Sequence, residues 1–275
     1  MPKDMKEISR ELRIDILRMF YVSKTGHLAP ALSCVDILAE LYFDGIIRWE
    51  QRFDEDRDRV ILSKGHACAA LYAVLAKAGY FPYEELMTFY QKNTRLLGLP
   101  SVLLPGIETP TGSLGQGICF ATGTALAAKV DENDARTYVI LGDGESEEGA
   151  VWEAAQFAAN HELDNLTVVM DRNRLQASTW VEEIAPLEPV ATKWQAFGWQ
   201  VLTVDGHDFA ALHEAFHKAQ SANGQPTLII ANTIKGKGLS FAENNPDWHS
   251  HAPTGEEWQQ AAQELGITLK ELKTI

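Results

Sequence analysis

The chain has 275 residues, a net charge of −14 at neutral pH and a hydrophobic content of 45%, which is ordinary for a soluble protein. The negative charge argues against nucleic acid or an anionic membrane surface as a general partner. No apolar run is long enough to span a bilayer, and the polar residues 1–4 do not resemble a signal peptide. The three cysteines are odd in number and lack metal-ligand spacing, so we expect free thiols in the cytoplasm.

Helical and strand patterns alternate along most of the chain. We expect strands over 57–62, 137–141, 166–170, 199–204 and 227–232. We expect helices over 5–22, 33–42, 117–129, 151–159, 187–197 and 208–221. A further helix should end near Gly79, a short one should cover 82–90, and one or two should follow 254. This alternation predicts a three-layer α/β fold with a doubly wound, mostly parallel sheet.

Residues 92–111 form a long segment without helical or strand periodicity, and they contain Pro100, Pro105 and Pro110. Loops of this length in a compact domain are usually functional or disordered. The apolar character of the segment argues against disorder. We therefore expect an ordered loop with a functional role.

A strand–helix–strand unit occupies residues 137–170. Both flanking runs are β-branched and continuously apolar, as in strands buried on both faces. Such crossovers are nearly always right-handed, so the two strands lie parallel and their carboxyl ends share one edge of the sheet. Asp143 follows the first strand and Asn173 follows the second, so the fold should bring these two side chains together.

A carboxylate, an amide oxygen and a nearby backbone carbonyl suit Mg²⁺ or Ca²⁺, because both ions take oxygen ligands. Gly142 and Gly144 flank Asp143 and would let a diphosphate approach the backbone. The simpler interpretation is that Gly142-Asp143-Gly144 only ends a strand. The second strand, ending in Asp171-Arg172-Asn173 after a helix of suitable length, favours the metal site.

Several motifs together resemble the transketolase family of thiamine diphosphate enzymes. They occur in family order and cover nearly the whole chain: T-G-H at 25–27, I-L-S-K-G-H-A at 61–67, P-T-G-S-L-G-Q-G at 110–117, G-D-G at 142–144, E-G-A-V-W-E-A-A-Q-F-A-A-N-H-E-L-D-N-L at 148–166, A-F-G-W-Q-V-L-T-V-D-G-H-D at 196–208 and N-T-I-K-G-K-G at 232–238. A full-length transketolase is about twice as long. The resemblance therefore implies that residues 1–275 are a single diphosphate-binding domain, the amino-terminal subunit of a split transketolase.

The resemblance also assigns roles to individual residues. It implies Mg²⁺ ligands at Asp143, Asn173 and the main-chain carbonyl of Leu175, and thiamine diphosphate contacts at Gly112, Leu114, Gly142, Asp143, Gly144 and Asn173. It implies that His27 and His66 line the channel above the thiazolium ring, and that His249, with His251 as the alternative, approaches the cofactor phosphate and the reacting carbon. It implies a carboxylate network across the subunit interface at Glu148, which could equally be an ordinary acid that interacts with the dipole at a helix start. Lys235 and Lys237 could neutralise phosphate, but we expect them to be solvated. We expect His161, His213 and His217, on predicted helices, to be surface or interface residues with no role.

One position departs from the family pattern. Transketolases usually carry a substrate-contacting histidine in the 92–111 region, where this chain reads Leu97-Gly98-Leu99-Pro100. Leu99 cannot form a hydrogen bond with a sugar, which puts an ordinary pentose phosphate in doubt. A less polar or unusual acceptor is the alternative.

In the family, a second domain supplies the glutamate that activates the cofactor. We therefore expect activity only with a separate carboxy-terminal subunit, in an α₂β₂ assembly that transfers a two-carbon ketol unit from a ketose phosphate to an aldehyde. Two alternatives stay open: the cofactor-binding subunit of a 2-oxo acid dehydrogenase or decarboxylating acyloin or acyl transferase, and a non-catalytic scaffold subunit.

Overall fold

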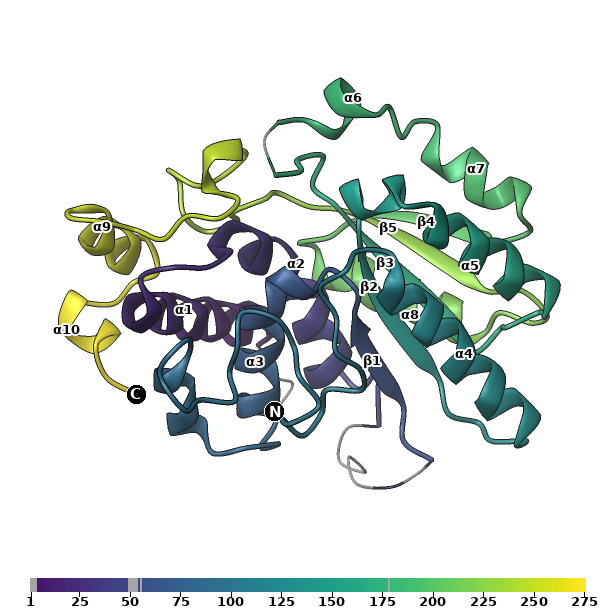
Figure 1. Ribbon diagram of the computed structural model, residues 1–275, viewed down its shortest axis with the longest axis horizontal. Helices are drawn as coiled ribbons and strands as arrows, with labels where there is room; N and C mark the ends of the chain where they lie inside the picture. Colours follow the sequence, from purple (N-terminus) through teal and green to yellow (C-terminus); the bar gives the residue numbers. More distant parts are fainter. Residues whose placement is uncertain (1–3, 49–53, 55, 178) are drawn as a thin grey trace.

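A parallel sheet forms the middle layer of the protein in the computed structural model, which describes residues 4–48, 54, 56–177 and 179–275 (Figure 1). Within this part of the chain the sheet has five strands in the order β1-β2-β3-β5-β4, all parallel to their neighbours. The strands are β1 (Arg59–Leu62), β2 (Thr137–Gly142), β3 (Leu166–Arg172), β4 (Gln200–Asp205) and β5 (Thr227–Asn232). The predicted α/β class with a parallel sheet is confirmed.

Helices cover both faces of this sheet (Figure 1). The α-helices are α1 (Met5–Ser23), α2 (Leu28–Phe43), α3 (Cys68–Lys77), α4 (Gln116–Val130), α5 (Gly149–Asn160), α6 (Val181–Ile184), α7 (Val190–Ala196), α8 (Phe209–Gln220), α9 (Glu257–Glu264) and α10 (Leu269–Leu272). Short 3₁₀ segments are η2 (Gly65–Ala67), η3 (Tyr83–Thr88), η4 (Gly144–Glu147) and η5 (Pro246–Trp248).

The strands are apolar throughout because each face of the sheet supports its own core. Tyr138 and Ile140 of β2 pack with α1, α2, α3 and α8, whereas Val139 and Leu141 pack with α4, α5 and α7. Successive side chains of a strand point to opposite faces, so a central strand needs apolar residues at every position. The continuous runs in the sequence are therefore the signature of the two-sided core.

Strand register determines where the site residues lie. Gly142, the last residue of β2, is paired with Asp171 of β3. Asp143 and Asn173 therefore leave the sheet at the same edge, each within a few residues of the paired positions. This is the edge at which open α/β sheets bind ligands.

Most elements agree with the sequence prediction, but α6 was not predicted, α7 begins at Val190 rather than at 187, and α2 begins earlier than expected. Helix α2 begins at Leu28, five residues before the expected start, with Pro30 in its first turn. Proline is tolerated there because the first amides of a helix have no intrahelical acceptor. The short helix expected over 82–90 is the 3₁₀ segment η3. Residues 92–111 contain no helix or strand, and buried Leu96 and Leu104 attach this loop to the core.

The cysteines are free, as expected. Cys34 and Cys68 are buried, and Cys119 is partly exposed. Every helix in the described part of the chain is too short or too polar to cross a bilayer. Residues 1–3 of the polar N-terminus lie outside the described residues.

Candidate active site

A cavity of about 340 Å³ lies at the carboxyl edge of the sheet, beside the ends of β1, β2 and β3. Segments distant in sequence form its walls: the loop before α2, the turn after β1, the loops around 99 and 112, the turns after β2 and β3, and the loops around 235 and 249. All but one of the site residues predicted from the sequence line it. These are His27, His66, Gly112, Leu114, Gly142, Asp143, Gly144, Asn173, Leu175 and His249.

Asp143 is buried at the end of β2. Its Oδ1 accepts a hydrogen bond from the Gly144 amide at 2.8 Å, and its Oδ2 accepts from the Arg174 amide and from Arg172 Nη1. Burial and the neighbouring Asp171 raise the pKa of this carboxyl group above its usual range. A bound cation would therefore stabilise the ionised form of Asp143.

Asn173 and Leu175 contribute two more oxygens next to Asp143. Asn173 Oδ1 accepts from the Leu175 amide at 3.0 Å, and the Leu175 carbonyl accepts from Lys235 Nζ at 3.0 Å. A carboxylate, an amide oxygen and a backbone carbonyl are the hard donors that Mg²⁺ prefers. The donor set therefore fits a divalent ion, which would replace the hydrogen bond from Lys235 at the Leu175 carbonyl.

Two glycines keep the cavity open. A Cβ at Gly144 would lie 3.0 Å from the Cβ of Gln176, and a Cβ at Gly112 would lie 2.6 Å from Leu99 Cδ1. Gly112 has a φ of +156°, at the limit of the region that favours glycine. A side chain at either position would press on the wall of the cavity, which fits a diphosphate approaching the backbone at Gly144.

Three imidazoles meet in the lining of the cavity. The ring centroids of His27, His66 and His249 lie 5.2 to 5.3 Å apart. His27 Nδ1 is buried and has no hydrogen-bond partner in the described part of the chain, which leaves it available for a ligand. His251 instead packs against Trp248, at a centroid distance of 4.6 Å, and is exposed.

All three imidazoles are neutral at physiological pH. Burial lowers the pKa of each ring, with further lowering by Lys235 for His27 and His249 and by Lys64 for His66. The pKa of His249 falls to about 3. A neutral imidazole has one donor and one acceptor nitrogen, so each ring can form hydrogen bonds with the hydroxyl groups of a ligand.

Lys235 overturns the expectation of a solvated side chain. It is 1% exposed, and its Nζ donates to the carbonyls of Leu175 and Gln176 and contacts His249 Nδ1 at 2.8 Å. Burial and the nearby Lys64 lower its pKa to about 7. The preceding strand β5 carries Lys235 to the carboxyl edge of the sheet. The sequence signal was the position of this lysine shortly after a buried strand.

Lys237 agrees with the expectation of a solvated lysine. It is partly exposed, and it pairs with Glu243 at 3.6 Å. The two lysines of the K-G-K sequence thus have different environments.

Glu148 is the predicted site residue that does not line the cavity. It is exposed at the N-terminus of α5. Glu145 is a buried residue of this region that the sequence did not predict. Its carboxylate accepts hydrogen bonds from the Gly115 and Gly142 amides at 2.8 and 2.9 Å and from Ser63 Oγ at 2.5 Å. Within the acidic run at 145–148, no local pattern distinguishes the buried glutamate from the exposed one.

A second polar network, also missed, supports the floor of the cavity. Lys64 Nζ forms an ion pair with Asp171 Oδ2, and Asp171 Oδ1 accepts from Ser33 Oγ at 2.7 Å and from Thr233 Oγ1. Although burial opposes ionisation, Lys64 lowers the pKa of Asp171 and Asp171 raises the pKa of Lys64 to about 12. Asn173 Nδ2 donates to both Ser33 and Asp171, so this network orients the predicted metal ligand.

Leu99 forms an apolar part of the cavity wall. Its side chain faces Gly112 and is 45% exposed. The long loop therefore contributes directly to the site, and an apolar group lies in the same lining as the three histidines.

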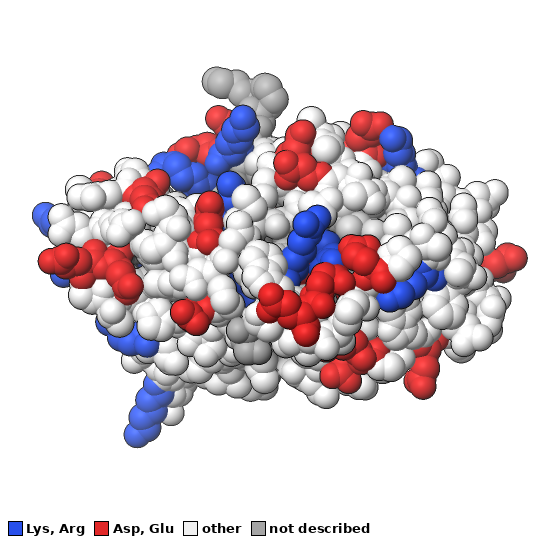
Figure 2. Space-filling view, turned by 90° about the horizontal axis from the view of Figure 1, so that it is seen from above, with Lys and Arg blue, Asp and Glu red and all other residues white. Residues whose placement is uncertain are grey.

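The positively charged side chains at the site are buried. Lys64 and Lys235 are buried and line the cavity, whereas Figure 2 shows acidic and basic side chains interspersed over the face seen from above. An anionic ligand would thus meet local cations within a chain whose net charge is −14.

A family model described as "Transketolase, thiamine diphosphate binding domain" matches residues 2–274. An apulose-4-phosphate transketolase subunit from Phocaeicola vulgatus is 39% identical over 266 residues, covering 96% of this chain and 95% of that protein. The 6-deoxy-6-sulfo-D-fructose transketolase subunit SqwG of Clostridium sp. (strain MSTE9) is 43% identical over 251 residues, covering 87% of this chain and 88% of that protein.

Solved structures of transketolases are also similar to this chain. A transketolase from Leishmania mexicana superposes with a TM-score of 0.91 at 28% identity, over all of this chain and 43% of that one. A transketolase from Campylobacter jejuni gives a TM-score of 0.88 at 29% identity, over 98% of this chain and 44% of that one. The chain thus spans less than half the length of these structures.

Proposed function

Because the chain belongs to the transketolase family, we propose that it is the cofactor-binding subunit of a two-subunit enzyme that transfers a two-carbon ketol unit from a ketose phosphate to an aldehyde. One observation carries this proposal. The oxygen donors of Asp143, Asn173 and Leu175 and the imidazoles of His27, His66 and His249 line one cavity at the carboxyl edge of the sheet.

In this proposal Asp143, Asn173 and the Leu175 carbonyl would hold Mg²⁺, and Gly142 and Gly144 would leave room for the diphosphate of thiamine diphosphate. Gly112 and Leu114 would contact the aminopyrimidine. When bound, the cofactor supplies the nucleophilic carbon that carries the ketol unit. The donor set and the space at Gly144 support this assignment.

The three histidines orient the sugar and move protons at its hydroxyls. The contact between Lys235 Nζ and His249 Nδ1 makes Nδ1 the acceptor when the lysine is charged. The Nε2–H of His249 is then the donor that remains for a substrate oxygen. Burial keeps the rings of His27 and His66 neutral, so each has one nitrogen that can donate a hydrogen bond and one that can accept it at a sugar hydroxyl.

A separate carboxy-terminal subunit completes the site, in an α₂β₂ assembly. The names of the relatives, transketolase subunits that this chain covers almost fully, support a two-subunit enzyme. Glu148 is exposed and therefore available to a carboxylate network with that partner. The free cysteines fit a reducing cytoplasm.

The substrate we propose is an unusual ketose phosphate or a less polar aldehyde. Leu99 offers methyl groups where a histidine would contact hydroxyls. Relatives named for apulose-4-phosphate and 6-deoxy-6-sulfo-D-fructose support a family branch with uncommon sugars.

Reconstitution tests this function. The chain is mixed with a candidate carboxy-terminal subunit, thiamine diphosphate and Mg²⁺, and products from a panel of ketose phosphates and aldehydes are identified by mass spectrometry. We expect two-carbon transfer from the mixture and none from either protein in isolation. Full activity of this chain by itself would contradict the split.

Two further experiments distinguish the proposed function from a 2-oxo acid enzyme and from a scaffold subunit. Turnover of pyruvate with release of carbon dioxide would favour a 2-oxo acid enzyme. Calorimetric titration with thiamine diphosphate and Mg²⁺ should show binding that Asp143→Ala removes, whereas a scaffold subunit need not bind either.

A further inference from the structure

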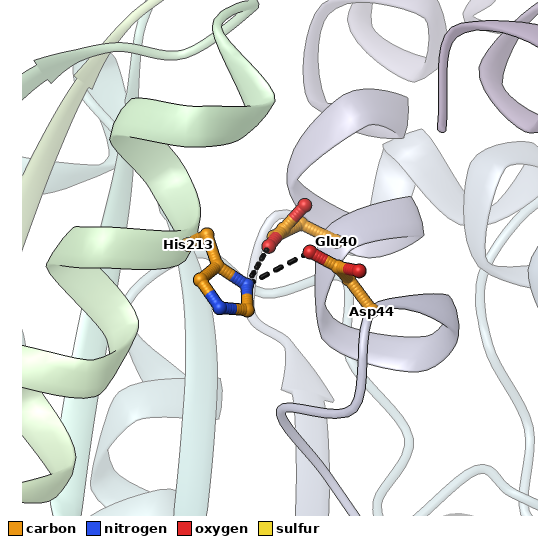
Figure 3. A group of neighbouring side chains, drawn as sticks. All are labelled: Glu40, Asp44 and His213. Atoms are coloured by element: carbon orange, nitrogen blue, oxygen red, sulfur yellow. Dashed lines mark hydrogen bonds and ion pairs between the residues drawn. The ribbon is translucent and has the colours of Figure 1, made fainter. Parts of the chain in front are cut away.

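Helices α2 and α8 carry a second cluster of polar side chains, outside the cavity lining. Glu40 and Asp44 extend from the end of α2 toward His213 of α8 (Figure 3). His213 Nδ1 lies 3.1 Å from Glu40 Oε1 and 2.8 Å from Asp44 Oδ2. One ligand atom from each side chain lies within 4.8 Å of the other two.

The buried glutamate is incompletely paired. The Glu40 side chain is 0% exposed, yet its Oε2 has no hydrogen-bond partner among the described residues. The imidazole of His213, next to Glu40 Oε1, is 41% exposed and is shared with Asp44. A buried carboxylate with a free oxygen beside a second carboxylate is costly unless a proton or a cation joins it.

We propose that Glu40, Asp44 and His213 bind one divalent transition-metal ion of the Zn²⁺ class, which links the end of α2 to α8. One imidazole nitrogen and two carboxylate oxygens suit Zn²⁺ better than Mg²⁺ or Ca²⁺, which take oxygen ligands alone. Tetrahedral Zn²⁺ with bonds of about 2.0–2.2 Å separates its ligand atoms by roughly 3.4 Å. The measured contacts of 2.8 and 3.1 Å need only small adjustments.

His217 supports the site from the adjacent turn of α8. Its Nε2 lies 2.9 Å from His213 Nε2. A metal on Nδ1 leaves the proton of His213 on Nε2, and that N–H donates to His217. Histidine ligands usually donate their second ring N–H in this way, which fixes the tautomer and the ring orientation.

The position on α2 also favours a cation. Asp44 is the C-cap of α2, where the helix dipole is negative. Asp44 and His213 are 36% and 41% exposed, so an ion can enter from solvent and water can complete its coordination.

Calorimetry with Zn²⁺ tests the site in the full chain, with thiamine diphosphate and Mg²⁺ in excess so that the Asp143 region is occupied. We expect one Zn²⁺ per chain. His213→Gln and Asp44→Asn should each weaken Zn²⁺ binding at least about tenfold. The matched control is His161→Gln, an exposed histidine at the end of α5, which should bind Zn²⁺ as the wild type does.

Both altered residues are partly exposed, so the variants should fold, and circular dichroism without Zn²⁺ checks this. Crystals grown with Zn²⁺ should give an anomalous peak between Glu40, Asp44 and His213. Absence of Zn²⁺ binding, unchanged affinity in both variants, or a peak only among the cavity histidines would each overturn the proposal and leave a carboxylate pair that shares a proton.

Discussion

Two buried aspartates near the ends of neighbouring strands have opposite electrostatic environments. Asp171 of β3 is held by Lys64, Ser33 and Thr233, and Lys64 lowers its pKa despite burial. Asp143, after β2, receives amide hydrogen bonds and a longer contact from Arg172, and its pKa is raised by burial and by Asp171.

The difference lies in the partner and not in the residue type. Asp171 has a buried ammonium group of its own and serves as a fixed part of the fold. Asp143 shares Arg172 with Glu182 and Glu188 and faces the cavity. A carboxylate whose charge is incompletely compensated at a cavity wall is suited to an exchangeable cation.

Removal of Lys64, the charged partner of Asp171, should have the largest effect, and the effect should be on stability. Lys64→Met keeps the apolar stem of the side chain but leaves a buried carboxylate unpaired, so we expect about 3–5 kcal/mol loss of unfolding free energy. Urea unfolding of the full chain measures this. The control is Lys129→Met, which removes a partly exposed pair with Asp164 and should cost about 1 kcal/mol or less. Equal losses in the two variants would contradict the distinction.

Asp143→Asn should affect function more than stability. The Gly144 and Arg174 amides donate to different oxygens of Asp143, so the single amide oxygen of Asn keeps one of these hydrogen bonds, and the charge that Mg²⁺ needs is lost. We expect affinity for thiamine diphosphate with Mg²⁺ to fall at least about 100-fold, beyond what loss of an outer-shell partner costs. Titration calorimetry measures it, with exposed Asp131→Asn as the control. Wild-type affinity in Asp143→Asn would remove this residue from the metal site.

A third buried aspartate, Asp36, extends the comparison to acid stability. Burial acts to raise the pKa of Asp36. The Arg13 guanidinium, which lies 2.8 Å from the carboxylate, outweighs this effect and holds the pKa of Asp36 well below its usual value of 3.8. Because the folded pKa is the lower one, this pair stabilises the protein above the unfolded pKa, and the contribution is lost as pH falls toward the folded pKa. Asp36→Asn should therefore flatten the loss of stability below pH 3.8, measured by urea unfolding. An unchanged slope would exclude Asp36 as a source of acid sensitivity.

The smallest expected effect is on substrate choice, in a variant that keeps Asp143 and Asp171 unchanged. Leu99→His would place a donor on the cavity wall, and one hydrogen bond should improve kcat/KM for hydroxyl-rich acceptors roughly 2–10-fold in the reconstituted enzyme. Cofactor affinity should not change. Leu97→His, an exposed neighbour outside the cavity lining, is the matched control. A similar response in both variants would mean that Leu99 does not contact the acceptor.

Part of the site follows from local sequence alone. The glycines around Asp143, the apolar strand before it and the helix after it define a strand-ending turn. The same reasoning applied to Asn173 correctly predicts that both residues reach one edge of the sheet. The loop over 92–111 was also recognisable, because its prolines and aperiodic pattern exclude regular structure.

Other site features have no local signature. Lys235 and Lys237 are separated by one glycine, yet only Lys235 is buried against Leu175, Gln176 and His249. Glu145 and Glu148 belong to one acidic run, yet Glu145 is buried and Glu148 is exposed. His213 was expected to have no role as a helix surface residue, and its two carboxylate neighbours come from α2, far away in sequence.

The sequence by itself determined the succession of strands and helices along the chain, the edge of the sheet that carries the site and most of its lining residues, because periodicity and turn chemistry depend on neighbouring residues. The tertiary structure decided which charges are paired, which are buried and which histidines meet. Those properties depend on atoms brought together from distant segments, because the cost of burying a charge is set by whatever surrounds it after folding.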